Sequence, residues 1–327
     1  MLFNIELPKK LNKFNYFKKN EKGCRLYSYN GNLGNDNYII CDYPDLEIEK
    51  DFCVLNTTLE TITRLQPNVD VNIGTDKIVA KSSKGKFSGK YVDSNLSIPT
   101  MDYQTSYPID LSILVKAANF TSTNEKKPIL TGVNLNGDEV IATDSFKLYK
   151  YHIGNGKSES ITLSTSYIKL ADALFDNKLT FADYNRNSIC IKQDNLMLIG
   201  NLLDGNFPDV QKIFAGFDDI TTPLEKNSIL ESIEIAKISG NVVVGKDKMF
   251  YATLDENKFI CTGNETFERE INYNGGKITF NAANLELALK CLESDNIKIR
   301  SKDGQLSCLT TEEKPNEKII LLGIKMI

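Results

Sequence analysis

The chain has 327 residues, a length that predicts two or three domains rather than one. Apolar residues make up 41% and charged residues 25%, which predicts a globular protein that is soluble in water. The formal net charge of −4 argues against a uniformly basic nucleic-acid-binding protein, although residues 8–25 contain six Lys, one Arg and a single Glu. An acidic protein with such a segment can still present one positive surface.

The side-chain inventory excludes most catalytic and metal chemistry. His152 is the only histidine, and its strand-like context predicts a structural role. The seven cysteines lack the paired spacing of a zinc site or a redox motif, so we expect reduced cysteines in the core. No apolar run approaches the length of a membrane span, and no basic segment followed by an apolar one opens the chain. We therefore expect a cytoplasmic protein with no membrane association, no cofactor and no metal.

The first third of the chain predicts two helices and several strands. Residues 8–20 hold most of the basic segment and are predicted as a helix with Pro8 in its first turn. Residues 55–92 predict a second helix, which Pro67 ends, and then strands. The apolar positions behind these assignments are Leu59, Ile62 and Leu65 at helical spacing, and Val69, Val71 and Ile73 in alternation.

The middle third repeats this arrangement. Residues 110–119 predict a helix for which Asp110 is the N-cap. Residues 164–203 predict another helix followed by alternating strands, and the apolar face of that helix carries Ile168, Ala171 and Leu174.

Between those two helices, residues 132–151 predict a β-hairpin with an unusual exit. Asn136-Gly137 suits a type I′ turn, in which both central residues need positive φ. After the return strand, residues 143–148 read Thr-Asp-Ser-Phe-Lys-Leu, which breaks the alternation of a strand. This composition predicts a binding site or a tight corner. Residues 204–214 contain Phe207-Pro208-Asp209, which predicts a rigid exit from another strand.

The last third predicts the unit once more. Residues 227–239 form a helix with Asn227 as N-cap, and residues 281–310 form a helix and two strands around a turn at 302–304. Three of the helices begin roughly every 110 residues, a period that indicates tandem domains rather than a solenoid. The predicted fold class is α+β, with three tandem domains at 1–104, 105–217 and 218–327, each with two helices and about eight strands, and with linkers at 93–108 and 214–227.

Two local patterns that suggest other chemistry fail on inspection. Residues 154–158, Gly-Asn-Gly-Lys-Ser, resemble part of a phosphate loop, but Tyr151 stands where the full pattern requires glycine and a strand follows instead of a helix. The pair Asp218-Asp219 lies in a predicted linker, where a solvated turn is expected. No Ser or Cys has a base partner beyond His152, so we predict that the protein is not an enzyme.

Three segments together resemble the bacterial β sliding clamp, the processivity factor of replicative DNA polymerase. They are residues 126–149, residues 202–214 with Gly-Asn-Phe-Pro-Asp, and residues 319–327, Ile-Ile-Leu-Leu-Gly-Ile-Lys-Met-Ile. The order and spacing of these motifs carry the resemblance, which covers residues 120–214 most fully and residues 1–50 least. Because the chain is shorter than a typical cellular clamp, with the deficit in the first domain, the resemblance suggests a divergent or phage-encoded version.

The resemblance implies a ring. Clamps of this type are head-to-tail homodimers whose six domains surround double-stranded DNA and bind it without regard to sequence. For this chain the sequence does not exclude a trimer. A hydrophobic cleft receives short peptide motifs of the DNA polymerase and the clamp loader. Two alternatives are a non-ring DNA- or peptide-binding module of phage replication and a purely structural β-rich protein.

The resemblance and the predicted elements together suggest three sets of residues, of which the cleft set is carried over position by position. The partner-peptide cleft would comprise Leu130, Thr143, Ser145, Phe146, Lys147, Leu148, Pro208, Lys212, Ile213, Leu322 and Ile324. The ring interface would pair residues 84–92 with residues 265–273 through Lys86, Phe87, Lys90, Glu268 and Arg269. For DNA contact, the positions on predicted helices favour Lys9, Lys10, Lys13, Arg64, Lys116 and Lys237.

The chain departs from the family pattern at three places in the cleft, one of them near Pro128-Ile129, where the family usually has bulky polar aromatics. Ser145-Phe146 stands where the family usually has glycine-histidine, and Gly323-Ile324-Lys325 replaces a proline-containing C-terminus. We therefore expect partner preferences that differ from those of a cellular clamp.

Overall fold

The computed structural model describes residues 2–3, 5–30, 37–92, 105–154, 159–176, 178–217, 223–238, 242–244, 247–302 and 305–325. Most of the predicted linker at 93–108, the pair Asp218-Asp219, most of the Gly-Asn-Gly-Lys-Ser stretch and the predicted turn at 303–304 lie outside these residues. The chain forms two compact units, Met1–Ser112 with Leu163–Leu203, and Ile113–Thr162 with Asp204–Ile327. No helix in the described ranges is long and apolar enough to cross a membrane.

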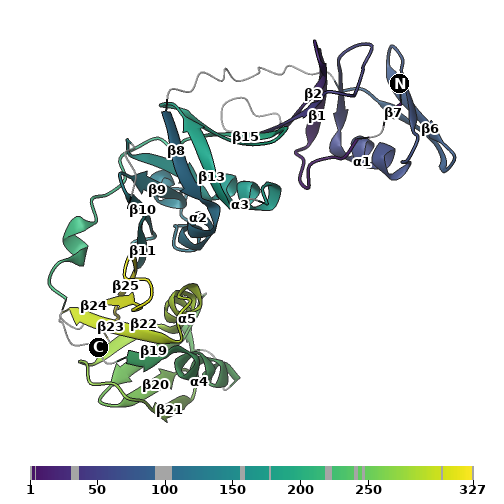
Figure 1. Ribbon diagram of the computed structural model, residues 1–327. Helices are drawn as coiled ribbons and strands as arrows, with labels where there is room; N and C mark the ends of the chain where they lie inside the picture. The colour runs from purple at the N-terminus through teal and green to yellow at the C-terminus, as the bar shows by residue number, and fades with distance from the viewer. Residues whose placement is uncertain are drawn as a thin grey trace. The chain divides into compact units, whose positions relative to one another are not determined.

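The first unit is built around an eight-stranded sheet (Figure 1). Its strand order is β4-β1-β2-β3-β15-β14-β13-β8, and the pairs whose registers are determined are all antiparallel. Strands β5, β6 and β7 form a separate three-stranded sheet in that order. The strands are β1 Phe14–Asn20, β2 Gly23–Tyr29, β3 Tyr38–Tyr43, β4 Phe52–Leu55, β5 Asp70–Ile73, β6 Lys77–Ser82, β7 Gly85–Lys90, β8 Thr105–Asp110, β13 Leu179–Tyr184, β14 Ser188–Gln193 and β15 Leu196–Asn201, with helices α1 Asn56–Arg64 and α3 Thr165–Leu174.

The second unit contains another eight-stranded sheet, β12-β9-β10-β11-β25-β24-β23-β16, and a four-stranded sheet, β21-β20-β19-β22. The strands are β9 Gly132–Asn136, β10 Glu139–Thr143, β11 Lys147–His152, β12 Ile161–Ser164, β16 Pro223–Glu225, β17 Val242–Val244, β18 Asp247–Met249, β19 Tyr251–Asp255, β20 Lys258–Thr262, β21 Thr266–Glu270, β22 Ile278–Asn281, β23 Asn296–Lys302, β24 Leu306–Thr310 and β25 Glu317–Leu322. The helices are α2 Leu111–Ala118, α4 Lys226–Ile238, α5 Ala282–Cys291 and two 3₁₀ turns, η1 Pro128–Thr131 and η2 Gln211–Phe214.

Each large sheet joins strands from two neighbouring thirds of the sequence. In the first, β3 pairs with β15, so that Cys41 lies opposite Leu196. In the second, β11 pairs with β25, so that Leu148 lies opposite Ile320. The middle third thus supplies strands to both large sheets. The three predicted domain boundaries themselves stay a prediction.

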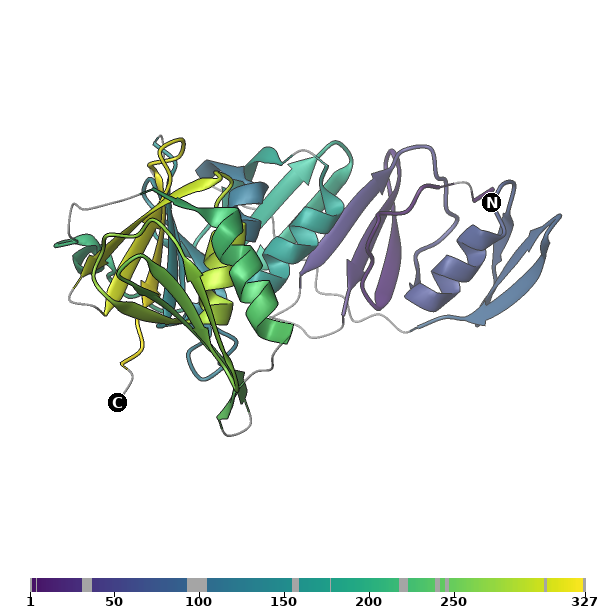
Figure 2. The same cartoon turned by 90° about the horizontal axis from the view of Figure 1, so that it is seen from below.

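The helices form where the apolar spacing predicted them. Leu59 and Ile62 of α1 are buried, as are Ile168, Ala171 and Leu174 of α3. Asp110 caps α2 by accepting a hydrogen bond from the backbone N–H of Ser112 at 2.8 Å. In the second unit α4 and α5 contact each other, shown in green and yellow-green in Figure 2.

Three local predictions were wrong. Residues 8–12 contain no helix and Phe14–Asn20 is strand β1, so the part of the first third that the structure describes contains a single α-helix. Asn227 is inside α4, which begins one residue earlier at Lys226. In the hairpin, Asn136 pairs with Glu139 and Gly137 has a φ of 59°, whereas Asp138 has no positive φ. The two central residues of the turn are therefore Gly137 and Asp138, and the turn is not type I′.

The cysteine prediction is confirmed. All seven cysteines are buried and none forms a disulfide. Burial raises the pKa of the Cys24 and Cys261 thiols to about 12, so both stay neutral at physiological pH. Within the described ranges, no group of three or more His, Cys, Asp or Glu side chains is arranged to hold a metal ion.

Candidate functional site

The residues after strand β10 form a tight corner. The Asp144 carboxylate accepts hydrogen bonds from the backbone N–H groups of Phe146 and Lys147, both at 2.8 Å, and also pairs with the Lys147 ammonium group. The Thr143 hydroxyl donates to the Lys147 carbonyl oxygen at 2.8 Å. Ser145 has a φ of 81°, in the left-handed region that favours glycine. These bonds hold the corner in a backbone conformation that its sequence would otherwise disfavour.

The corner turns Phe146 outward. Its side chain is 62% exposed, which is unusual for phenylalanine, while Leu148 two residues later is only 3% exposed. The Phe146 carbonyl accepts a hydrogen bond from the backbone N–H of Leu322 at 2.9 Å, which ties the corner to the end of β25. Leu322 is 40% exposed. Two large apolar side chains from distant parts of the sequence thus stand side by side where β11 begins and β25 ends.

A hollow of about 280 Å³ lies between them. Beneath it the buried side chains of Leu148, Val210 and Ile320 belong to one apolar cluster with Ile141 and Cys308. An apolar floor with exposed apolar side chains at the rim is typical of a site that binds an apolar segment of a partner.

Most of the predicted cleft residues line this hollow. The eight that do so are Thr143, Ser145, Phe146, Lys147, Leu148, Pro208, Ile213 and Leu322.

Three predicted cleft residues do not line it. Leu130 is buried in η1, and Lys212 has an exposed side chain in η2. Ile324 donates its backbone N–H to the Thr279 carbonyl at 2.7 Å, beyond the end of β25.

Four lining residues were missed by sequence reasoning: Asp209, Val210, Leu306 and Ile320. Ile320 lies two residues before Leu322 in β25, so the period of a strand could have identified it. Leu306 lies opposite Leu322 in the register of β24 with β25, which no local pattern reveals.

Several predicted DNA-contact residues are already paired with acids. Lys9 contacts Asp176 at 2.5 Å and Lys237 contacts Glu286 at 2.5 Å. Lys116 contacts Glu293 at 2.5 Å and approaches the buried Glu317 carboxylate at 3.6 Å. Its pKa is raised, because these carboxylates outweigh the opposing effect of burial.

The remaining three DNA-contact candidates are freer. Lys10, Lys13 and Arg64 are exposed. None of them forms an ion pair with another described residue. The Lys13 ammonium group lies 5.0 Å from the centre of the Phe14 ring.

The two strands predicted to form the ring interface are both edge strands. Among the strands that the structure describes, β7 pairs only with β6, and β21 pairs only with β20. Phe87 is half-buried, whereas Lys86, Lys90 and Glu268 are exposed.

Arg269 is engaged within its own chain. One of its guanidinium nitrogens donates to the Ser228 carbonyl and to Glu231, both at 2.8 Å, and so attaches β21 to α4.

The chain matches no protein-family model. The beta sliding clamp of Staphylococcus aureus (strain Mu50 / ATCC 700699) is 25% identical to it over 274 residues, which cover 73% of this chain and 70% of that protein. The beta sliding clamp of Staphylococcus epidermidis is 24% identical over 280 residues, with the same coverage of 73% and 70%.

Solved structures show the same likeness in the fold. The beta subunit from DNA polymerase of Streptococcus pyogenes superposes with a TM-score of 0.82 at 17% identity, over 96% of this chain and 92% of that one. The DNA polymerase sliding clamp from Bacillus subtilis superposes with a TM-score of 0.78 at 18% identity, over 96% and 91%. In the order of its motifs and in its fold, the chain is similar to the bacterial β sliding clamps.

Proposed function

We propose that the protein is a DNA sliding clamp, a non-enzymatic processivity factor that encircles duplex DNA and tethers a polymerase through a peptide-binding cleft. The observation that carries this proposal is the hollow beneath Phe146 and Leu322, with its buried apolar floor. Peptide recognition of this kind needs a few apolar anchors in a desolvated pocket rather than a large contact area. We place the protein in the cytoplasm, where its DNA and partners would be.

The rim of the hollow gives the sharpest test of the cleft. Leu148 is buried, so Leu148→Ala would itself lower the free energy of unfolding by about 2–5 kcal/mol. Phe146 and Leu322 are exposed in the unbound protein, and their truncation leaves the core intact. We expect Phe146→Ala with Leu322→Ala to weaken binding of a replicative polymerase C-terminal peptide by about 2 kcal/mol, or roughly thirtyfold in Kd.

A matched control is available on β13. Leu179 and Phe181 are 68% and 63% exposed, so Leu179→Ala with Phe181→Ala removes the same side-chain types from another surface. Fluorescence anisotropy of the labelled peptide should show wild-type affinity for this control. Equal affinity of the rim variant and the control would place the peptide site elsewhere.

We further propose that two copies of the chain close a ring, with edge strand β7 of one copy beside β21 of the other. Two unpaired edges supply the backbone groups for such pairing. Exposed Lys86, Lys90 and Glu268 would contribute ion pairs of about 0–1 kcal/mol each, which salt screens. Retention on nicked circular DNA, lost on linearisation, would support a ring. Retention that survives linearisation would favour the alternative, a non-ring module that binds DNA in a groove.

We propose that contact with DNA is electrostatic and independent of sequence. Lys10, Lys13 and Arg64 are the preferred contacts because their charges have no acidic partner in the described part of the chain. Replacing all three with Gln should lower retention on circular DNA. It should also reduce the slope of log affinity against log salt by about one unit for each phosphate that the variant no longer neutralises. An unchanged slope would remove these residues from the DNA surface.

A further inference from the structure

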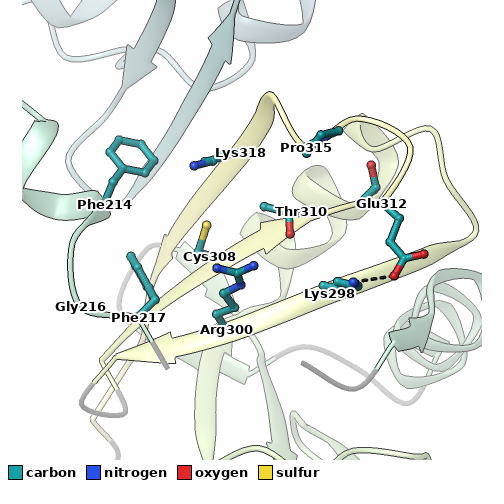
Figure 3. Close-up of a pocket in the computed structure, with 11 residues that line it drawn as sticks. Phe214, Gly216, Phe217, Lys298, Arg300, Cys308, Thr310, Glu312, Pro315 and Lys318 are labelled. Atoms are coloured by element: carbon teal, nitrogen blue, oxygen red, sulfur yellow. Dashed lines mark ion pairs between the residues drawn. The ribbon is translucent and has the colours of Figure 1, made fainter. Parts of the chain in front are cut away.

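A second hollow, of about 530 Å³, adjoins the cleft on the second sheet. Figure 3 shows its lining: Lys298 and Arg300 on β23, Cys308 on β24 and Lys318 on β25, with Phe214 at the end of η2 and Phe217 just after η2 on the opposite side. None of these residues was assigned to a site by the sequence.

The strand register shows that the hollow and the cleft are neighbours. Arg300 lies opposite Cys308, and Cys308 lies opposite Ile320, which lines the cleft. The 3₁₀ turn η2 lines both, because its Ile213 lines the cleft and its Phe214 lines the hollow. Strands are about 4.8 Å apart, so Arg300 and Ile320 are separated by about 10 Å, which an extended peptide covers in about three residues. A peptide anchored in the cleft can therefore reach the hollow.

The hollow carries uncompensated positive charge. Lys298 pairs with Glu312 at 2.5 Å. Arg300 and Lys318 have no acidic partner within 4.0 Å among the described residues. Burial raises the pKa of the Cys308 thiol to about 11, against the opposing effect of Lys318 and Arg300, so the thiol is neutral and does not offset the two cations. The site thus offers two positive charges beside two aromatic rings.

We propose that this hollow extends the peptide-binding cleft and receives an acidic side chain of the partner segment, about three residues from its apolar anchors. The inference rests on the proposed peptide-binding function of the cleft. Continuity with an apolar cleft favours a peptide carboxylate over a nucleic-acid phosphate, because a partner with both apolar and acidic side chains matches both surfaces. Arg300 can bind a carboxylate with two parallel hydrogen bonds.

The test uses synthetic labelled peptides with one Leu-Phe anchor. Two of them carry three Asp residues, either before or after the anchor, and two matched peptides carry Asn in place of Asp. Binding is measured by anisotropy to the full-length protein and to the variant Arg300→Gln with Lys318→Gln. The variant Lys81→Gln with Lys192→Gln removes the same two charges from exposed strand positions in the other unit.

We expect one of the Asp peptides to bind the wild type about threefold to tenfold more tightly than its Asn partner. That preference should disappear in Arg300→Gln with Lys318→Gln and persist in the charge-matched control. The single variant Arg300→Gln, at an exposed position, should lose part of it, which guards against misfolding of the double variant.

Other outcomes would overturn the inference in distinguishable ways. If the double variant binds the Asp and Asn peptides with the wild-type preference, the hollow does not take an acidic side chain, although the cleft still binds peptides. If Phe146→Ala with Leu322→Ala leaves all four affinities unchanged, the cleft function fails and this extension fails with it. If the double variant lowers retention on circular DNA and leaves the Asp preference intact, the hollow binds nucleic acid instead.

Discussion

The positive charge of Lys116 could either contact DNA or stabilise the fold, and the two roles predict different results. As a DNA contact it would be free in the unbound protein, and its loss would leave stability unchanged. The structure instead surrounds it with acids: Glu293 at 2.5 Å and Glu317 at 3.6 Å, with its own side chain 23% exposed. Glu317 is 1% exposed and accepts a hydrogen bond from the Tyr149 hydroxyl at 2.8 Å. We therefore expect Lys116 to stabilise the fold by compensating a buried carboxylate.

The expected magnitude follows from that burial. Breaking a fully buried ion pair costs about 3–5 kcal/mol, and an exposed pair contributes about 0–1 kcal/mol. Lys116→Met breaks a partly exposed arrangement around one buried carboxylate, so we expect a loss of about 2–3 kcal/mol in the free energy of unfolding. Lys237→Met is the control, because its pair with Glu286 leaves it 40% exposed. Its cost should stay below about 1 kcal/mol.

A double variant combines Lys116→Met with Glu317→Gln. Removing the buried charge itself should recover about 1–2 kcal/mol, because Lys116→Met is costly mainly through the carboxylate it leaves unpaired. Urea unfolding monitored by circular dichroism measures all four proteins, since the chain has no tryptophan. If Lys116→Met costs no more than Lys237→Met, or if the double variant is less stable than Lys116→Met, the proposed compensation is wrong.

Three further predictions concern the corner, acid stability and the ring. Ser145→Gly should raise the free energy of unfolding by about 0.5–1 kcal/mol because it relieves a positive φ, whereas Ser106→Gly at an exposed position of β8 should lower it by a similar amount. The pKa of Glu293 is lowered to about 2 by hydrogen bonds from Lys116 and Lys314, so protonation favours the unfolded chain and stability should fall as the pH drops from about 5 to 2. The Glu293 side chain is 59% exposed, so its contribution to this loss of stability should be less than about 1 kcal/mol. Urea titrations of the wild type and of Glu293→Gln measure this contribution, because the wild type should lose more stability on acidification than the variant by that amount. Sedimentation at increasing salt concentration should show that the dimer dissociates, and Phe87→Ala should dissociate at a lower salt concentration than the wild type. A dimer that resists salt, or a stable trimer, would contradict the proposed interface.

Sequence pattern alone identified most of the helices and the corner after β10, whereas the predicted cleft residues came from the resemblance to clamps. Apolar residues at helical spacing locate α1, α3 and α5, because each helix must bury one stripe of its surface. The break in alternation at residues 143–148 marked the corner, since two small polar residues and an acid do not continue a half-buried strand. In these segments the residues of the segment itself decide the backbone conformation, so the local sequence was sufficient to predict it.

The basic segment shows where local pattern failed. Residues 14–20 form strand β1 because Phe17 is buried in the first unit, while Phe14 and Tyr16 pack against a second apolar cluster. This is alternation of period two, which the lysines and Pro8 obscured. Pairing with β2 and β4 completes the strand's hydrogen bonds, and neither partner is visible in the segment itself.

Tertiary structure decided which residues line the cleft and the adjoining hollow. Leu306 joins the cleft and Arg300 joins the hollow only because β24 pairs with β23 on one side and β25 on the other, and β25 pairs with β11 from the middle third. A shift of one residue in any of these pairings would turn the side chains to the opposite face. Sequence pattern therefore predicted several of the segments that become strands, but not β1. The register between distant strands determined which of their side chains meet, because backbone hydrogen bonds across the sheet fix it.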